Sequence, residues 1–264
     1  MKYIDVHCHV QFEQYDTDQD ELLARMHERE VAGIVVGVDY ESSQKAIALA
    51  QKHEHLFASI GLHPNYEGEE SYEVEKYREL AKSRKVVAIG ECGLDYYRPT
   101  EVNDEVKAKQ KAILNDQIKL AGELDLPLII HSRPSKGTQD AYEDVIEILT
   151  KAKQKFPNLR GDIHFFVGGV HEAEALITLG FTLSFTAVIT FARNYDEVIR
   201  AIPLTSILSE TDSPYVAPLS RRGQRNDPLA VEEVVAEIAS IRGEDLDEIR
   251  ATLVENAKRL FSLS

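Results

Sequence analysis

The sequence predicts a TIM (β/α)8 barrel, formed as a single domain over residues 1–264. Three observations support this fold class. Eight short apolar runs alternate with amphipathic stretches from one end of the chain to the other. The length of 264 residues is typical of such a barrel. Several runs, such as Gly33–Val38, are almost wholly apolar, which is typical of parallel strands covered on both faces.

The expected elements follow one another without an internal repeat or a linker. Strands are predicted at Tyr3–His9, Gly33–Val38, Phe57–His63, Val86–Cys92, Pro127–Ser132, Gly161–Val167, Phe181–Thr186 and Ser206–Thr211. Helices are predicted between them at Asp18–Ala32, Ser42–His53, Ser71–Arg84, Asp104–Leu124, Ala141–Lys153, His171–Leu179 and Arg193–Ala201. Two more follow the last strand, at Asp227–Ile241 and Leu246–Leu260, so the barrel has an extra C-terminal helix. Asp245 is expected to cap the second of these.

The main alternative is a doubly wound open sheet. Such a sheet usually has fewer strands and often a glycine-rich turn after the first one. Here the first strand is followed by Gln11-Phe12-Glu13-Gln14, which lacks that pattern. Within the barrel, the loop Arg98–Asn103 and the segment Pro134–Asp140 are the expected excursions.

Composition limits the partners and the location. The formal net charge is −15, so the protein repels nucleic acid and anionic lipid except where contact is local or mediated by a metal. Hydrophobic residues make up 43% of the chain, which is ample for a core. The two cysteines form no disulfide framework, and no signal peptide or membrane-spanning run is evident. We therefore expect a cytoplasmic protein with no membrane contact and no obligate protein partner.

The first strand carries three polar residues spaced by two. Alternation places Asp5, His7 and His9 on one face of the strand, and its apolar residues on the other. Two imidazoles and a carboxylate that converge in this way suit a divalent metal. The alternative is that both histidines are buried and hydrogen-bonded, and that Asp5 is either structural or a support for a ligand histidine.

Barrel enzymes carry their chemistry at the C-terminal ends of the strands, and this sequence has titratable residues there. Six of them are possible metal ligands: His7, His9, Glu91, His131, His164 and Asp212. Six such side chains exceed the needs of one ion, whereas two ions could share Glu91 and a bridging hydroxide, which is a nucleophile at neutral pH. Asp212 is then expected to act as general base. Four other histidines lie on or beside predicted helices and are expected to be solvated: His27, His53, His55 and His171.

The order of these motifs resembles the TatD family of metal-dependent DNases, within the amidohydrolase superfamily. The resemblance spans the chain. It rests on Asp5-x-His7-x-His9, Gly61-Leu62-His63-Pro64, Gly90-Glu91-x-Gly93-Leu94-Asp95, His131-Ser132-Arg133, Glu210-Thr211-Asp212-Ser213-Pro214, Arg222-Gly223-x-Arg225-Asn226-x-Pro228 and Glu255-Asn256-Ala257-x-x-Leu260-Phe261. It implies a deoxyribonuclease with two divalent metal ions (Mg²⁺, Mn²⁺ or Zn²⁺). The expected substrate is single-stranded DNA or a DNA 3′ end, attacked in a 3′-5′ exonuclease-like manner.

Substrate contacts are expected from basic residues near the strand ends. His63 ends the third strand, and Arg133 follows the ligand candidate on the fifth. Arg222 and Arg225, with Arg221, follow the eighth strand in an otherwise acidic protein. The planar guanidinium suits phosphate oxygens, although a solvated loop or an ion pair is the alternative for each arginine. Tyr96 and Tyr97 are expected either to stack on bases or to pack at the rim.

Two departures from the family pattern leave the substrate open. The sixth-strand motif reads His164-Phe165-Phe166-Val167-Gly168-Gly169, where the family has a small residue or Cys, then Phe, Ser or Thr, and Gly. Residues 134–140 look like a small insertion. A hydrolase of a small phosphodiester, a lactone or an amide is therefore the alternative. A non-catalytic metal-binding barrel is a third hypothesis, against which Asp212 argues.

Overall fold

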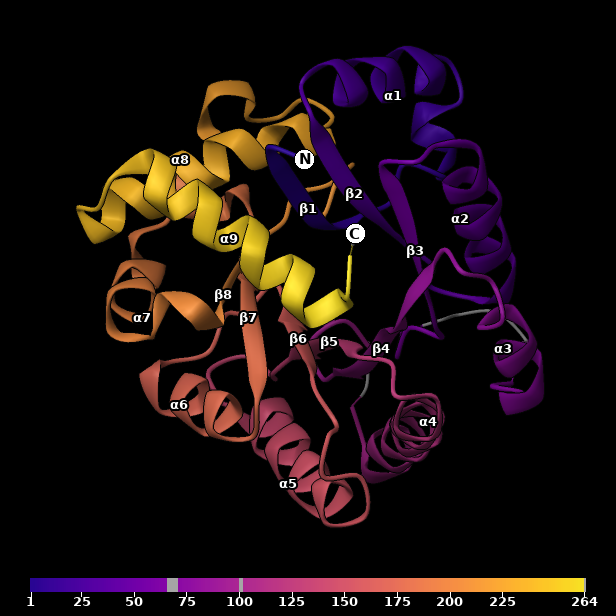
Figure 1. Ribbon diagram of the computed structural model, residues 1–264. Helices are drawn as coiled ribbons and strands as arrows, with labels where there is room; N and C mark the ends of the chain where they lie inside the picture. The colour runs from indigo at the N-terminus through magenta and orange to yellow at the C-terminus, as the bar shows by residue number, and fades with distance from the viewer. Residues whose placement is uncertain (66–70, 100–101, 264) are drawn as a thin grey trace.

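A computed structural model of the chain describes residues 1–65, 71–99 and 102–263. Eight parallel strands pair in chain order and form a nearly closed barrel with helices outside it, which confirms the predicted fold class (Figure 1). The strands are β1 (Tyr3–Cys8), β2 (Val31–Val36), β3 (Leu56–Ile60), β4 (Val86–Asp95), β5 (Leu128–Arg133), β6 (Gly161–His164), β7 (Phe181–Phe185) and β8 (Ile207–Ser209).

The helices follow the strands as the sequence predicts, and α9 is the extra one. They are α1 (Gln19–Glu28), α2 (Tyr40–Lys52), α3 (Val74–Leu80), α4 (Asp104–Leu124), α5 (Asp140–Lys155), α6 (Val170–Thr178), α7 (Asp196–Ala201), α8 (Val231–Arg242) and α9 (Leu246–Phe261). Asp245 caps α9, because its carboxylate accepts hydrogen bonds from the backbone N–H groups of Asp247 and Glu248. No helix among the described residues has both the length and the apolar character needed to cross a bilayer.

Several predicted boundaries are wrong. The strands predicted to end at His63 and Val167 end at Ile60 and His164, and the helix predicted from Asp227 begins at Val231. The predicted helix through Ala32 stops earlier, because α1 ends at Glu28 and β2 already begins at Val31. A left-handed turn at Glu30, with φ of 57°, separates them. The predicted helix Ser71–Arg84 shortens to α3, and residues 66–70 before it lie outside the described part. Residues 100 and 101 of the expected loop Arg98–Asn103 also lie outside the described part.

The seam between the first and last strands is closed by side chains as well as by backbone. Cys8 and Ser213 form a parallel bridge. The buried carboxylate of Asp5 accepts hydrogen bonds from Thr211, at 2.9 Å from the backbone N and 2.5 Å from the hydroxyl. Asp5 therefore has a structural role in this seam.

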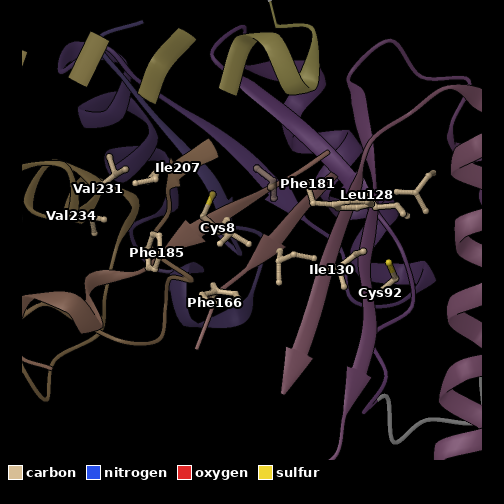
Figure 2. Packing of buried hydrophobic residues seen from close by; sticks show 14 of the residues in the cluster. Cys8, Cys92, Leu128, Ile130, Phe166, Phe181, Phe185, Ile207, Val231 and Val234 are labelled. Atoms are coloured by element: carbon tan, nitrogen blue, oxygen red, sulfur yellow. The ribbon is translucent and has the colours of Figure 1, made fainter. Parts of the chain in front are cut away.

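The apolar core is divided between two clusters. The larger lies beneath the surrounding helices, and Figure 2 shows part of it, including Phe181 and Phe185 of β7 and Leu128 and Ile130 of β5. The smaller joins Ile4 and Val6 to α9 residues such as Val254 and Phe261. Burial of this apolar surface fixes α9 across the barrel, where Figure 1 shows it.

The simple alternation predicted for the first strand does not hold throughout. Val6 packs in the smaller cluster with α9, whereas Cys8 and Val10 pack in the larger one. The cause is a shift in the pairing of β1 with β2 between Asp5 and Cys8. Cys8 and Cys92 are both free and buried, and each thiol donates to a backbone carbonyl.

Candidate metal centre

The six predicted ligand residues converge at one end of the barrel. His7, Glu91, His131 and His164 lie on β1, β4, β5 and β6, and His9 and Asp212 follow the ends of β1 and β8. Four of the side chains are buried and the other two partly buried. Parallel pairing explains the convergence, because it brings the carboxyl ends of all strands to the same edge. His131 and His164, for example, are direct register partners.

The carboxylate of Glu91 lies between two groups of imidazoles. Its Oε2 lies 3.4 Å from Nε2 of His7 and 4.0 Å from Nε2 of His9. Its Oε1 lies 3.1 Å from Nδ1 of His131 and 3.5 Å from Nε2 of His164. A carboxylate with one oxygen toward each group has the geometry of a bridge between two cations.

Asp212 completes the group around His7 and His9. Its Oδ1 lies 3.5 Å from Nε2 of His9 and 3.9 Å from Nε2 of His7. The residue has a left-handed backbone, with φ of 52°, a conformation that aspartate tolerates better than most residues. Its backbone N–H donates to the His7 carbonyl at 2.9 Å, which ties the loop after β8 to β1.

The hydrogen bonds of the imidazoles indicate which nitrogens are free to bind a metal. Nδ1 of His9 lies 2.8 Å from the Val36 carbonyl, and Nδ1 of His164 lies 3.1 Å from Glu210 Oε1. These acceptors require N–H groups, so in the neutral rings the opposite nitrogens keep their lone pairs. The lone pair on Nε2 of His164 faces Glu91. The lone pair on Nε2 of His9 faces Asp212 and also Nε2 of His7, which lies 3.1 Å away. A lone pair that faces a carboxylate oxygen is repelled by it, and a cation between the two removes the repulsion. The residues therefore fit divalent metal ions.

The charge balance of the site also favours cations. Burial lowers the pKa of His164, but Glu210 and Glu91 outweigh burial and raise it to about 10. Burial raises the pKa of Glu91, yet His63 and His164 bring it well below its usual range. The carboxylates thus stabilise positive charge in this pocket, whether a proton or a metal ion carries it.

His63 differs from the other histidines of the site. Its Nδ1 accepts a hydrogen bond from the backbone N–H of Asn65 at 3.0 Å, so in the neutral ring Nε2 carries the hydrogen. That Nε2 lies 3.3 Å from Oε1 of Glu91. His63 therefore presents a donor to the site.

Two carboxylates that the sequence interpretation did not assign support the histidines. Asp95 Oδ2 lies 3.0 Å from Nε2 of His131, and Glu210 accepts from His164 as described above. Glu210 also accepts from Ser184 at 2.8 Å. The spacing of Asp95, four residues after Glu91 in an extended run, is a signal that could have revealed it, because such residues share a face.

The predicted substrate arginines separate in the structure. Arg133 lines the same cavity as the metal-centre residues. Arg225 lies outside that lining and pairs with Asp18 at 2.8 Å, and Arg222 lies outside it too, with its guanidinium 4.0 Å from the Phe191 ring centroid. Arg225, and likewise Arg221 with Asp227 at 2.8 Å, thus forms the ion pair that the sequence left open as the alternative, whereas Arg222 is exposed and stacks on an aromatic ring.

The two tyrosines after Asp95 also separate. Tyr96 is buried, and its hydroxyl donates to Asp144 at 2.8 Å, so it packs at the rim. Tyr97 is 52% exposed, and the Arg133 guanidinium lies 4.2 Å from its ring centroid. Of the four histidines expected in solvent, His27 and His171 are exposed, and His53 and His55 are partly buried.

The cavity above the metal centre has a volume of about 980 Å³. Its floor contains His9, His63, Glu91, His131, His164 and Asp212. Its walls include Arg98, Lys109 and Arg133 and the aromatic residues Phe12, Phe165, Tyr195 and Tyr215. A cavity of this size, with titratable groups converging in it, is typical of an active site.

Comparisons with known proteins agree with this geometry. The family described as TatD related DNase matches residues 4–262. The chain is 37% identical to an uncharacterized metal-dependent hydrolase, YabD, from Bacillus subtilis, covering 98% of this chain and 99% of that protein. It is 34% identical to the 3′-5′ ssDNA/RNA exonuclease TatD of Erwinia amylovora, covering 95% of this chain and 96% of that protein. The crystal structure of YjjV, a TatD homologue from Escherichia coli, superposes with a TM-score of 0.88 at 31% identity, covering 100% and 99%.

Proposed function

The chain belongs to the TatD family of metal-dependent hydrolases, and from that premise we propose that it hydrolyses phosphodiester bonds of DNA, from the 3′ end of a single strand. The observation that carries the proposal is Glu91, with one oxygen toward His7 and His9 and the other toward His131 and His164. An unmodified carboxylate in this position suits a pair of divalent cations.

We propose that the cations are held by two sets of side chains that share Glu91. One set is His7, His9, Glu91 and Asp212, and the other is Glu91, His131 and His164. When bound, such cations make water more acidic and stabilise the charge on a phosphoryl group. Mixed imidazole and carboxylate ligands are compatible with Zn²⁺, Mn²⁺ or Mg²⁺.

The remaining steps belong to the side chains of this protein. Asp212, at the floor of the cavity, accepts the proton of the attacking water as general base. His63 donates the hydrogen on Nε2 to a phosphoryl oxygen, because its Nδ1 is already occupied by Asn65. Arg133 on the cavity wall supplies a guanidinium for the same phosphate or a neighbouring one. The cytoplasmic location is likewise proposed, from the two free, buried cysteines.

Hydrolysis of 5′-labelled single-stranded DNA by protein loaded with Mg²⁺, Mn²⁺ or Zn²⁺ tests the proposal. We expect products that shorten stepwise from the 3′ end, no activity in EDTA, and a kcat lowered about 100- to 10,000-fold in Asp212→Asn. Thermal unfolding of the variant shows whether it is folded. Loaded wild-type protein that leaves every DNA intact contradicts the proposal.

A second candidate is hydrolysis of a small phosphodiester, a lactone or an amide. The observation that favours it is the apolar wall formed by Phe165 and Val167, where the family pattern has smaller or polar residues. A panel of small esters and amides, assayed beside oligonucleotides, separates the two candidates by kcat/KM.

A further inference from the structure

The geometry points to a second phosphate-binding subsite in the cavity, formed by Arg98, Lys109 and Arg133. We propose that it binds a phosphodiester next to the one being cleaved, so the substrate is a strand of several nucleotides. The inference rests on the proposed nuclease function and names what that function requires of its substrate. Arg98 lies in the loop after β4, Lys109 lies on α4, and Arg133 ends β5.

Helix α4 turns one face toward the cavity. Val106, Lys109, Gln110 and Ile113 line it, at the three- and four-residue spacing of a helical stripe. The helix is fixed there because the buried Gln110 accepts from the backbone N–H of Asp95 at 2.9 Å and donates to its carbonyl at 3.1 Å. Asp95 also holds His131, so Lys109 has a defined place relative to the metal centre.

Two of the three charges of the subsite have no carboxylate partner in the described part of the chain. Among residues 1–65, 71–99 and 102–263, neither Lys109 nor Arg133 has a carboxylate oxygen within 4.0 Å, and Arg98 reaches Asp95 only at 4.0 Å. Two other lysines of α4 do have partners: Lys107 lies 2.8 Å from Asp140 and Lys111 lies 2.6 Å from Asp144.

In a protein with 45 acidic and 30 basic residues, three cationic side chains that line one cavity require an explanation, because two of them have no carboxylate within 4.0 Å among the described residues. A phosphate group of the substrate, bound by these side chains, provides that explanation. Phosphate oxygens suit both guanidinium and ammonium groups.

The rim of the cavity offers flat surfaces next to these charges. Tyr97 lies under the Arg133 guanidinium and is 52% exposed, and Tyr215 lines the cavity and is 48% exposed. Cationic groups interleaved with aromatic faces are typical of proteins that bind single-stranded nucleic acid. The volume of about 980 Å³ lies at the upper end of the range for ligand sites, so it suits more than one phosphodiester.

The subsite is tested by comparing a long and a short substrate. Arg98→Ala, Lys109→Ala and the double variant are assayed on an oligothymidylate of about eight nucleotides and on bis(4-nitrophenyl) phosphate. Lys119→Ala is the matched control, because Lys119 lies on the same helix, is exposed and does not line the cavity. We expect each single variant to raise KM for the oligonucleotide about tenfold with kcat nearly unchanged, because one charge-assisted contact is lost. KM for the small diester stays at the wild-type value.

Binding gives a second readout that does not depend on turnover. The Kd of a fluorescein-labelled oligothymidylate is measured by anisotropy between about 50 and 200 mM salt. Each lost phosphate contact is expected to reduce the magnitude of the slope of the logarithm of the association constant against the logarithm of the salt concentration by about 0.7. Unchanged binding in the double variant, or equal KM changes on both substrates, overturns the subsite. If wild-type protein cleaves no DNA, the nuclease proposal fails, and the anisotropy result alone decides whether the subsite exists.

Discussion

Asp95 Oδ2 lies 3.0 Å from Nε2 of His131, and this contact fixes which imidazole nitrogen faces Glu91. An ionised carboxylate only accepts hydrogen bonds, so Nε2 carries the hydrogen and the neutral ring keeps its lone pair on Nδ1. That Nδ1 lies 3.1 Å from Glu91 Oε1. Burial raises the pKa of Asp95, but contacts with His131 and two backbone N–H groups outweigh it and hold the pKa below the usual range, so the carboxylate is ionised.

Asp95→Asn is therefore expected to weaken metal binding. The amide has a donor as well as an acceptor, so it no longer enforces the tautomer of His131. Loss of such a supporting carboxylate typically lowers metal affinity about 10- to 100-fold. Calorimetric titration with Mn²⁺ measures the change, and Asp144→Asn, beside the rim residue Tyr96, is the control. An affinity equal to that of the control variant would falsify this role for Asp95.

Glu91→Gln is expected to lower the number of metal ions that the protein retains. The amide presents only one acceptor oxygen, so it cannot serve both His7 and His131 sides as the carboxylate does. Elemental analysis after dialysis should show a fall from about two ions per chain to one or none. The surface variant Glu244→Gln should keep the wild-type content. Equal metal content in both variants would contradict a bridging Glu91.

Gln117→Leu is expected to destabilise the fold. Gln117 is fully buried, and its amide pairs with both backbone groups of Leu62, at 3.0 Å to N and 2.9 Å to O. Leucine leaves those two groups without partners inside the protein, at a cost of about 2–4 kcal/mol in the free energy of unfolding. Urea denaturation measures it, with Gln51→Leu on the exposed side of α2 as control. If Gln117→Leu loses no more free energy of unfolding than the control variant, the hydrogen bonds between Gln117 and Leu62 do not stabilise the fold as proposed.

His55 is expected to make the protein less stable in mild acid. Its Nε2 is buried without a hydrogen-bond partner, and burial, with the charges of His27 and His53, lowers the pKa of His55 from 6.5 to about 4. The unfolded chain therefore binds a proton more readily than the folded one. The contribution of His55 is fully present above pH 6.5 and is lost as the pH falls toward 4.

The free energy of unfolding is measured above pH 6.5 and at about pH 5, in EDTA, for the wild type and for His55→Gln. The quantity compared is the loss of stability between the two pH values. Wild type should lose more stability on acidification than the variant. His171→Gln, at a side chain that is 91% exposed, is the control. Parallel losses in wild type and His55→Gln would remove His55 as the cause.

The sequence by itself determined the barrel and the set of side chains at its carboxyl end. Apolar runs of strand length report burial on both faces, and parallel strands place whatever follows them at one edge. His7, Glu91 and His164 could therefore be found without coordinates, although they are far apart in the chain.

The tertiary structure decided the pairings. Arg225 pairs with Asp18, 207 positions away in the sequence, and Asp5 closes the barrel seam through Thr211. Asp95 supports His131, and Lys109 faces the cavity while Lys111 of the same helix faces Asp144. Periodicity in a sequence reports only which face of an element a residue occupies. The partner on the opposing element depends on loop paths and on how helices are rotated against the sheet, which only the folded chain specifies.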